Sequence, residues 1–97
     1  MDKDYSIIRK SLVSLAIEQT LIEIGYHMLE TVTRRLFEKY HCYLPDCYET
    51  PEYLKEILKE LFEDSYSEII ESIKTRLDEF SSEVHIAEFL LQLTKNS

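Results

Sequence analysis

The sequence predicts an all-α protein, a bundle of three to four helices with long N- and C-terminal helices, completed by homodimerisation. Turn-forming residues are almost absent, apolar residues recur at steps of three and four, and proline and capping signals divide the chain into three segments. One glycine and two prolines in 97 residues exclude the frequent turns of a β-sandwich. A chain of this length is expected to form a single domain, residues 1–97.

The first predicted helix covers about residues 5–40. Two adjacent apolar stripes run along it, which is typical of a helix inside a bundle. The first stripe is Tyr5, Ile8, Leu12, Leu15, Ile22, Tyr26, Leu29, Leu36 and Tyr40, and the second is Ile17, Leu21, Ile24, Met28 and Val32. Gly25 costs about 1 kcal/mol relative to alanine in a helix and predicts a close helix crossing or a slight bend. A capping box of Thr20 and Glu23 is the alternative, and it would split the segment into two helices.

A proline-containing connection precedes the second predicted helix, at about residues 51–62. Pro45 cannot continue a helix, and Thr50-Pro51 places an N-cap residue before a proline at the first helical position. Apolar residues of this segment lie on one face, and charged residues lie on the other.

The third predicted helix covers about residues 65–94, and a capping box of Ser65 and Glu68 marks its start. A heptad stripe of apolar residues runs along the segment. Ser81-Ser82 offers a break near 81–82, so two helices in phase are the alternative to one helix. We predict the subunit interface on this stripe, at Ile70, Ile73, Leu77, Phe80, Val84 and Leu91.

The lengths of the two long helices predict self-association. Unbroken, they would extend about 54 Å and 43 Å at 1.5 Å per residue. A compact chain of this size has a radius of gyration of about 13 Å and cannot cover such helices alone. A two-fold homodimer is the simplest closed assembly that buries them.

The formal net charge of −8 lies entirely in the second half of the chain. Residues 1–45 carry six acids and six bases, whereas residues 46–97 carry thirteen acids and five bases. An acidic surface repels phosphate backbones, so nucleic acid is not an expected partner. A small basic patch, of which a regulator would use Arg34, Arg35 and Lys39, keeps a transcription-associated regulator open as a second alternative. Its residues are Arg9, Lys10, Arg34, Arg35 and Lys39.

The chain contains no long apolar run, either near its N-terminus or elsewhere. A membrane span takes about 18 apolar residues or more, so no membrane partner is expected. We predict an intracellular, cytoplasmic protein. Its two cysteines are then expected to remain free thiols, because that compartment is reducing.

The stretch EKYHCYLPDCYETPEYL, residues 38–54, holds both cysteines and both prolines. His41, Cys42 and Cys47 are weak candidates for a zinc site, because a structural site takes four ligands and the fourth is missing. We predict no metal and packing thiols, with a disulfide or a metal as alternatives. Glu38 and His41 have the spacing of half a di-iron motif, whose further carboxylates come from facing helices.

The chain lacks the glycine-rich turns that position a nucleophile or hold a phosphate, so neither catalysis nor a cofactor is expected. Four of the seven tyrosines surround the connection. Amphipathic rings of this kind either cover the end of a core or form a partner-binding patch. These tyrosines are Tyr40, Tyr43, Tyr48 and Tyr53.

Several local features of Leu21–Ile73 form a pattern. They are an internal glycine (Gly25), a Lys-Tyr pair (Lys39, Tyr40), a Leu-x-Asp loop (Leu44, Asp46), a Pro-Glu-x-Leu helix start (Pro51 to Leu54) and a terminal Leu-Phe (Leu61, Phe62). The segment resembles small archaeal helical domains of unknown function, including the Nitrosopumilus-type output domain. That family has glycine where this chain has His41 and Glu63. The resemblance implies an interaction or output module and no catalytic residue.

We therefore predict a module that acts through protein contacts. A metal-binding or redox protein, using the Cys42/Cys47 loop or the Glu38/His41 pair, is the alternative.

Overall fold

The computed structural model describes residues 2–80 and 82–94, and this part of the chain is all-α, as predicted. Its five α-helices are α1 (Asp2–Ile24), α2 (Tyr26–Tyr40), α3 (Pro51–Phe62), α4 (Tyr66–Leu77) and α5 (Val84–Thr94). Short 3₁₀ helices lie in three connections: η1 (Leu44–Tyr48), η2 (Glu63–Ser65) and η3 (Asp78–Phe80). None of the helices described is both long and apolar enough to cross a membrane.

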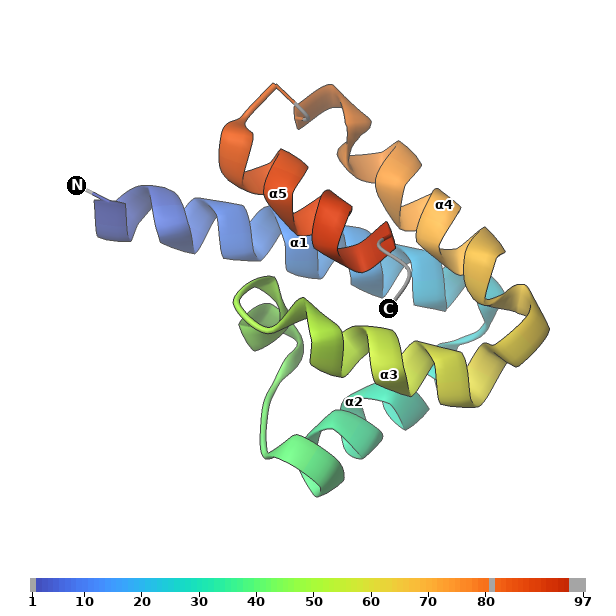
Figure 1. Ribbon diagram of the computed structural model, residues 1–97. Helices are drawn as coiled ribbons and strands as arrows, with labels where there is room; N and C mark the ends of the chain where they lie inside the picture. Colours follow the sequence, from blue (N-terminus) through green and yellow to red (C-terminus); the bar gives the residue numbers. More distant parts are fainter. Residues whose placement is uncertain (1, 81, 95–97) are drawn as a thin grey trace.

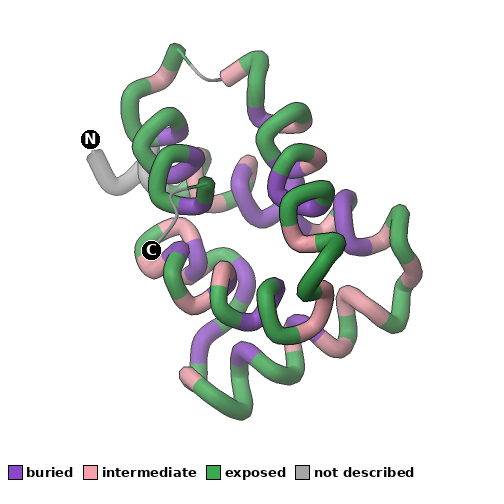
Figure 2. Tube along the Cα trace, turned by 45° about the vertical axis from the view of Figure 1, so that its right-hand side comes forward, coloured by how far each residue is buried: buried purple, intermediate pink, exposed green. Residues whose placement is uncertain are grey.

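Helix α1 is the longest element, and the other elements are arranged around it. It contacts η1, α2, α4 and α5. In Figure 1, α4 and α5 lie on one side of α1, and α2, η1 and α3 lie on the other. Buried residues from all five helices meet between them (Figure 2), and Ile17 and Leu21 of α1 are completely buried there. These two residues of the second predicted stripe therefore face the core, whereas Ile24, at the end of α1, is 47% exposed.

A single helix over residues 5–40 is wrong, because the helix breaks at Gly25. The Gly25 backbone is extended (φ 160°, ψ 143°). Its N–H donates to the Leu21 carbonyl (3.0 Å) and its carbonyl accepts from the Met28 N–H (2.9 Å), so one helix ends and the next begins there. The alternative of two helices is correct, but the Thr20/Glu23 capping box is not the cause. Thr20 is buried inside α1 and its hydroxyl donates to the Ala16 carbonyl (2.9 Å).

The third predicted helix is also broken, and the alternative of two helices is confirmed. Helix α4 ends at Leu77, and the Glu83 carboxylate begins α5 by accepting the N–H groups of His85 and Ile86, both at 3.1 Å. The predicted capping box at the start of α4 does not form, because the Ser65 side chain makes no capping hydrogen bond. The second predicted helix matches α3 at both ends.

The six residues of the predicted interface do not share one surface. Ile70, Ile73 and Leu77 are buried in the core of their own chain, with at most 4% of each side chain exposed, so none of the three offers a surface to a second subunit. Phe80 packs partly against the same core. Val84 and Leu91 lie beyond the break and remain exposed. The break rotates α5 out of the register that a continuous heptad stripe requires.

The molecule is more compact than the predicted long helices require. Its radius of gyration is 12.6 Å and its principal extents are 35 × 26 × 25 Å. The 23 residues of α1 extend about 35 Å, which fits the longest dimension. The lengths of the helices therefore do not favour a homodimer.

Candidate functional site

The connection between α2 and α3 is an ordered turn. Helix α2 ends at Tyr40, and the next residue, His41, has a left-handed backbone (φ 54°, ψ 36°) and donates its N–H to the Phe37 carbonyl (2.9 Å). The Asp46 carboxylate accepts the Tyr43 N–H (3.0 Å) and fixes the start of η1. The Thr50 hydroxyl donates to the Asp46 carbonyl (3.2 Å) instead of capping α3. These bonds fix the shape of the turn, and its buried residues Cys42, Leu44 and Cys47 pack it against the core.

Both cysteines of this turn are free thiols that pack into the core. Cys47 is completely buried, and burial raises the pKa of its thiol far above the ordinary range. Burial also raises the pKa of Cys42. The Cys47 thiol donates a long hydrogen bond to the Tyr43 carbonyl (3.9 Å). Both groups are protonated at neutral pH, a state that suits packing and not nucleophilic attack.

The candidate metal ligands are not brought together. His41 is exposed, and its ring lies edge-on against Phe37 at 5.5 Å between centroids. Glu38 is also exposed. Within residues 2–80 and 82–94, no three His, Cys, Asp or Glu side chains gather in a way that could hold an ion.

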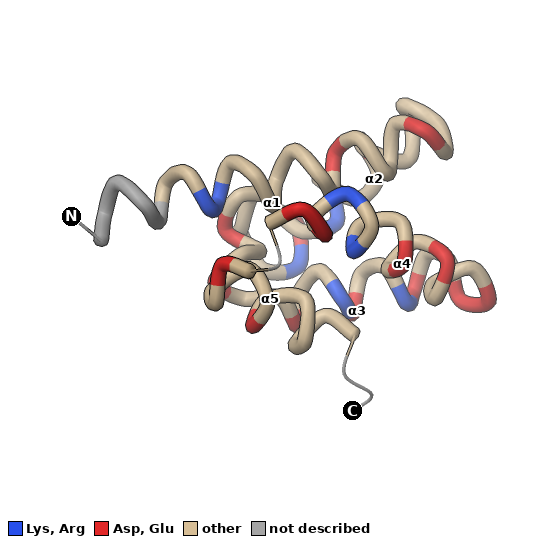
Figure 3. Tube along the Cα trace, turned by 90° about the horizontal axis from the view of Figure 1, so that it is seen from above, with Lys and Arg blue, Asp and Glu red and all other residues tan. Residues whose placement is uncertain are grey.

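The basic patch is divided between two helices and paired with acids. Lys10 of α1 contacts Glu49, the residue after η1 (2.6 Å). Lys39 of α2 contacts two carboxylates of α3, those of Glu56 (2.7 Å) and Glu60 (3.0 Å). Further contacts join Arg9 to Tyr48 (2.9 Å) and Glu83 (3.7 Å), and Arg35 to Glu60 (3.8 Å). The blue residues of Figure 3 therefore form no single cationic surface. Arg34 is exposed on α2.

Three of the four tyrosines around the turn cover the core. Tyr40 stacks on Tyr53, with centroids 4.0 Å apart and rings 3° from parallel, and its hydroxyl donates to Glu56. Tyr48 stacks on Phe89 at 6.2 Å. These three side chains are half-buried, as expected of a lid.

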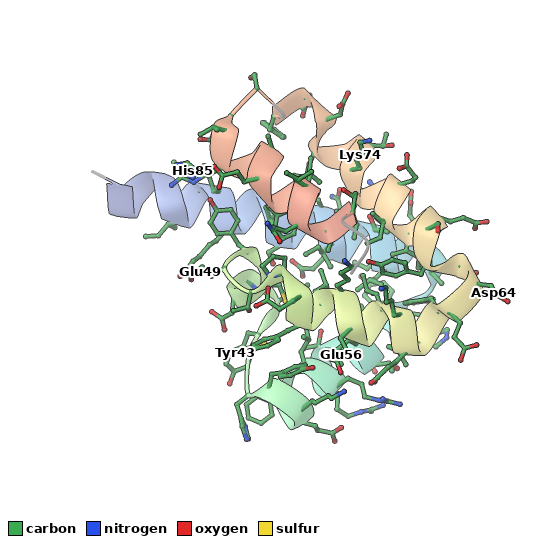
Figure 4. All side chains as sticks on the ribbon, in the orientation of Figure 1. Tyr43, Glu49, Glu56, Asp64, Lys74 and His85 are labelled. Carbon is green, nitrogen blue, oxygen red and sulfur yellow. The ribbon has the colours of Figure 1, made fainter. Side chains whose placement is uncertain are left out.

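Tyr43 behaves differently, because 58% of its side chain is exposed. Its ring lies 5.6 Å from that of Phe37, which is 44% exposed. We call this pair the aromatic rim. Figure 4 shows Tyr43 at the end of the molecule where the turn leaves α2. Phe37 was not among the residues predicted for the site. The sequence does hold a signal for it, because Phe37 lies outside both apolar stripes, and an apolar residue in such a position is expected to be exposed.

A shallow groove of about 280 Å³ lies beside the aromatic rim, between α1, α2 and the turn. We call it the turn groove. It is lined by Ser14, Glu18, Leu29, Thr33, Tyr43, Leu44 and Pro45. Glu18 is the acidic residue of the lining, and within the described part of the chain its hydrogen bond comes from the Ser14 hydroxyl at 3.5 Å. Ser14 and Glu18 were also missed, because their place in the groove depends on how α1 packs against the turn.

No protein-family model, curated protein or solved structure matches this chain. The resemblance to archaeal helical domains therefore stays a prediction. The assignment of function rests on the geometry described above.

Proposed function

We propose that the protein is an interaction module without catalytic activity of its own, and that it binds a protein partner through the aromatic rim and the turn groove. The exposed pair Phe37 and Tyr43 beside an apolar groove is the observation that carries this proposal. Aromatic side chains are enriched at protein interfaces because they bury a large area with few rotatable bonds. Phe37 is held by helix α2 and Tyr43 by an ordered turn, so binding orders little additional chain.

The lining of the groove selects the chemistry of the partner. Leu29, Leu44 and Pro45 accept an apolar side chain, and Glu18 accepts a basic one. The net charge of −8 attracts a cationic segment over a longer range. The partner is thus a protein segment with an apolar anchor and an adjacent lysine or arginine.

The double variant Phe37→Ser/Tyr43→Ser tests this function. The protein and the variant are used as baits in an extract of the source cells, and bound proteins are quantified by mass spectrometry. Proteins that bind through the rim should be lost from the double variant and retained by Leu91→Ser, which replaces an equally exposed apolar residue on α5. Identical partner profiles for the double variant and the parent protein would refute the assignment, provided that circular dichroism shows both to be folded.

We also propose that the module is a cytoplasmic homodimer. The observation that favours self-association is the set of large apolar side chains left exposed on α1, among them Ile8 and Leu15. Contiguous exposed apolar surface on a small protein marks an interaction site. Sedimentation velocity over a range of concentrations tests the homodimer, and a monomer at every concentration would refute it.

A further inference from the structure

We infer that a second copy of this chain binds on the outer face of α1, with the two α1 helices antiparallel about a two-fold axis at Leu15. The inference rests on the proposed homodimer and identifies its surface. The outer face is formed by the first apolar stripe of α1 together with two small or neutral polar residues. Its residues are Ile8, Ser11, Leu12, Leu15, Gln19 and Ile22.

This face is exposed although it is apolar. Ile8 is 54% exposed and Leu15 is 51% exposed, while Leu12 and Ile22 are half-buried. A helix on the surface of a protein ordinarily turns its polar side to water. Helix α1 is apolar on two sides, and its completely buried residues Val13, Ile17 and Leu21 lie on the inner one.

The outer face of α1 also lacks charge, in a chain of which 31% of the residues are charged. The exposed sides of the other helices do carry charges, for example Arg34 on α2, Glu52 on α3, Glu71 on α4 and Glu88 on α5. A face without charge loses little solvation when it is covered.

The absence of charge favours a second copy over other occupants. Two copies each carry a net charge of −8 and repel one another, so they can meet only where no like charges come together. The large exposed apolar residues of α5, Val84 and Leu91, flank Glu88 on a helix without lysine or arginine. Pairing two α5 helices would therefore bring acids together, whereas pairing two α1 helices would not.

The order of residues on the outer face is self-complementary. An antiparallel pair centred on Leu15 sets Leu15 against Leu15 of the partner, Ile8 against Ile22, Ser11 against Gln19 and, at the edge of the contact, Leu12 against Glu18. Each contact is repeated in the other half, as in an isologous two-fold interface, and the central pairs join like chemistry. Ile8, Leu15 and Ile22 are seven residues apart, the spacing of helices that pack at about 20°.

A groove on one flank of this face extends its apolar surface. It has a volume of about 480 Å³ and lies between α1 and the start of α5, where Ile8 and Leu12 approach Phe80 and Ile86. Its charged and titratable lining residues are Arg9, Glu79, Glu83 and His85, and Arg9 contacts Glu83 (3.7 Å).

The test compares Leu15→Asp with Leu91→Asp, both at exposed positions, by sedimentation velocity. Leu15→Asp should weaken self-association at least about 100-fold, because it sets two carboxylates together on the axis. Leu91→Asp should leave the dimer intact. Circular dichroism and thermal unfolding check that both variants are folded, and Ile8→Asp replaces Leu15→Asp if the latter is not.

A cross-linking measurement gives a positive readout. Leu15→Cys should form a disulfide-linked dimer rapidly under a mild oxidant, since the two sulfurs lie on the axis, and Leu91→Cys should not. If the unmodified protein is a monomer at every concentration, both the homodimer and this surface are refuted. If it is a dimer that Leu15→Asp does not dissociate and Leu15→Cys does not link, the homodimer stands and the surface is refuted.

Discussion

At the scale of single residues, His41 and Glu63 are the two non-glycine residues with positive φ in the described part of the chain. Both lie just after a helix, at α2 and α3 respectively, where the chain reverses direction. A left-handed backbone costs an L-amino acid roughly 1–2 kcal/mol, and glycine escapes most of this cost. These two positions are therefore places where the native residue is not the one that best suits the backbone.

Replacing His41 with glycine should stabilise the protein by about 0.5–1 kcal/mol, because glycine adopts the left-handed conformation without strain. The edge contact of His41 with Phe37 is lost, but both rings are exposed and the contact contributes little. The free energy of unfolding in urea measures the effect. Glu38→Gly, at an exposed helical position three residues earlier, should instead lower stability by about 1 kcal/mol. A loss of stability in both variants would contradict the assignment of strain to His41.

Residues of the predicted heptad stripe differ in how far they are buried, and this difference leads to a second prediction at this scale. Ile73→Ala should destabilise the protein by about 2–5 kcal/mol, because it leaves a cavity in a core that the side chain fills completely. Val84→Ala changes stability by about 0.5 kcal/mol or less, since Val84 is exposed. Chemical denaturation of both variants measures the difference. Equal effects would mean that the two residues share one surface, as the continuous stripe predicted.

At the scale of elements, the sequence predicted the class of every helical segment and both ends of α3. A proline at the first helical position is a strong local signal, and it does not depend on the rest of the fold. The breaks at Gly25 and between Phe80 and Val84 were harder to place, because apolar periodicity can continue in phase across a break. Periodicity also cannot tell which of two apolar stripes packs against the rest of the chain. The sequence therefore did not predict which stripe of α1 is buried and which is exposed.

The candidate site was less predictable for a related reason. The turn was located correctly by its prolines, and half-buried tyrosines around it were expected. The groove itself needs Ser14 and Glu18 of α1 beside Leu44 and Pro45 of the turn, and these residues are far apart in the sequence. Only the packing of α1 against η1 brings them together.

The contact between α2 and α3 predicts how stability depends on pH. The Lys39 ammonium, and after it the Tyr40 hydroxyl, hydrogen-bonds to Glu56 and lowers the pKa of that carboxyl. Since the folded pKa is lowered, the stabilisation is fully present above the ordinary glutamate pKa of about 4.3. It is lost as the pH falls through the lowered value, because the folded state must then take up a proton that the unfolded state already holds.

Glu56→Gln should therefore reduce the loss of stability in acid. The measurement is the urea midpoint of unfolding at neutral pH and at several values below the ordinary glutamate pKa. Glu52→Gln, on the exposed side of the same helix, serves as the control and should follow the parent protein. The prediction fails if Glu56→Gln and the parent lose stability in parallel.

At the scale of the whole molecule, the two halves of the chain are joined by charge. Six ion pairs between residues that the structure describes connect a residue of 1–45 with a residue of 46–97. One of them runs in the opposite sense, from Arg76 on α4 to Glu23 on α1, and Arg76 also donates to the Thr20 hydroxyl (3.1 Å). Exposed pairs of this kind each contribute little to stability. Their larger effect is that basic side chains of residues 1–45 are paired with acidic side chains of residues 46–97.

This pairing makes a prediction about nucleic acid, the partner of the transcription-associated alternative. Lys10, Arg35 and Lys39 face carboxylates within their own chain, so binding a phosphate would require breaking those contacts in the field of a net charge of −8. Counterion release supplies most of the affinity for duplex DNA. Lysine and arginine side chains that are already paired with carboxylates displace few counterions from the DNA. We expect no salt-dependent binding of duplex DNA in fluorescence anisotropy at about 50 mM salt.

A triple variant provides the matched control for that measurement. The triple variant is Glu49→Gln/Glu56→Gln/Glu60→Gln. It removes the carboxylates that face Lys10, Arg35 and Lys39 and leaves these three cationic side chains in place. It should bind DNA more tightly than the parent, and added salt should reverse the gain, since the freed cations now displace counterions. Tight, salt-sensitive binding by the parent protein, equal to that of the triple variant, would mean that the ion pairs open readily and that the first half of the chain presents a cationic surface after all.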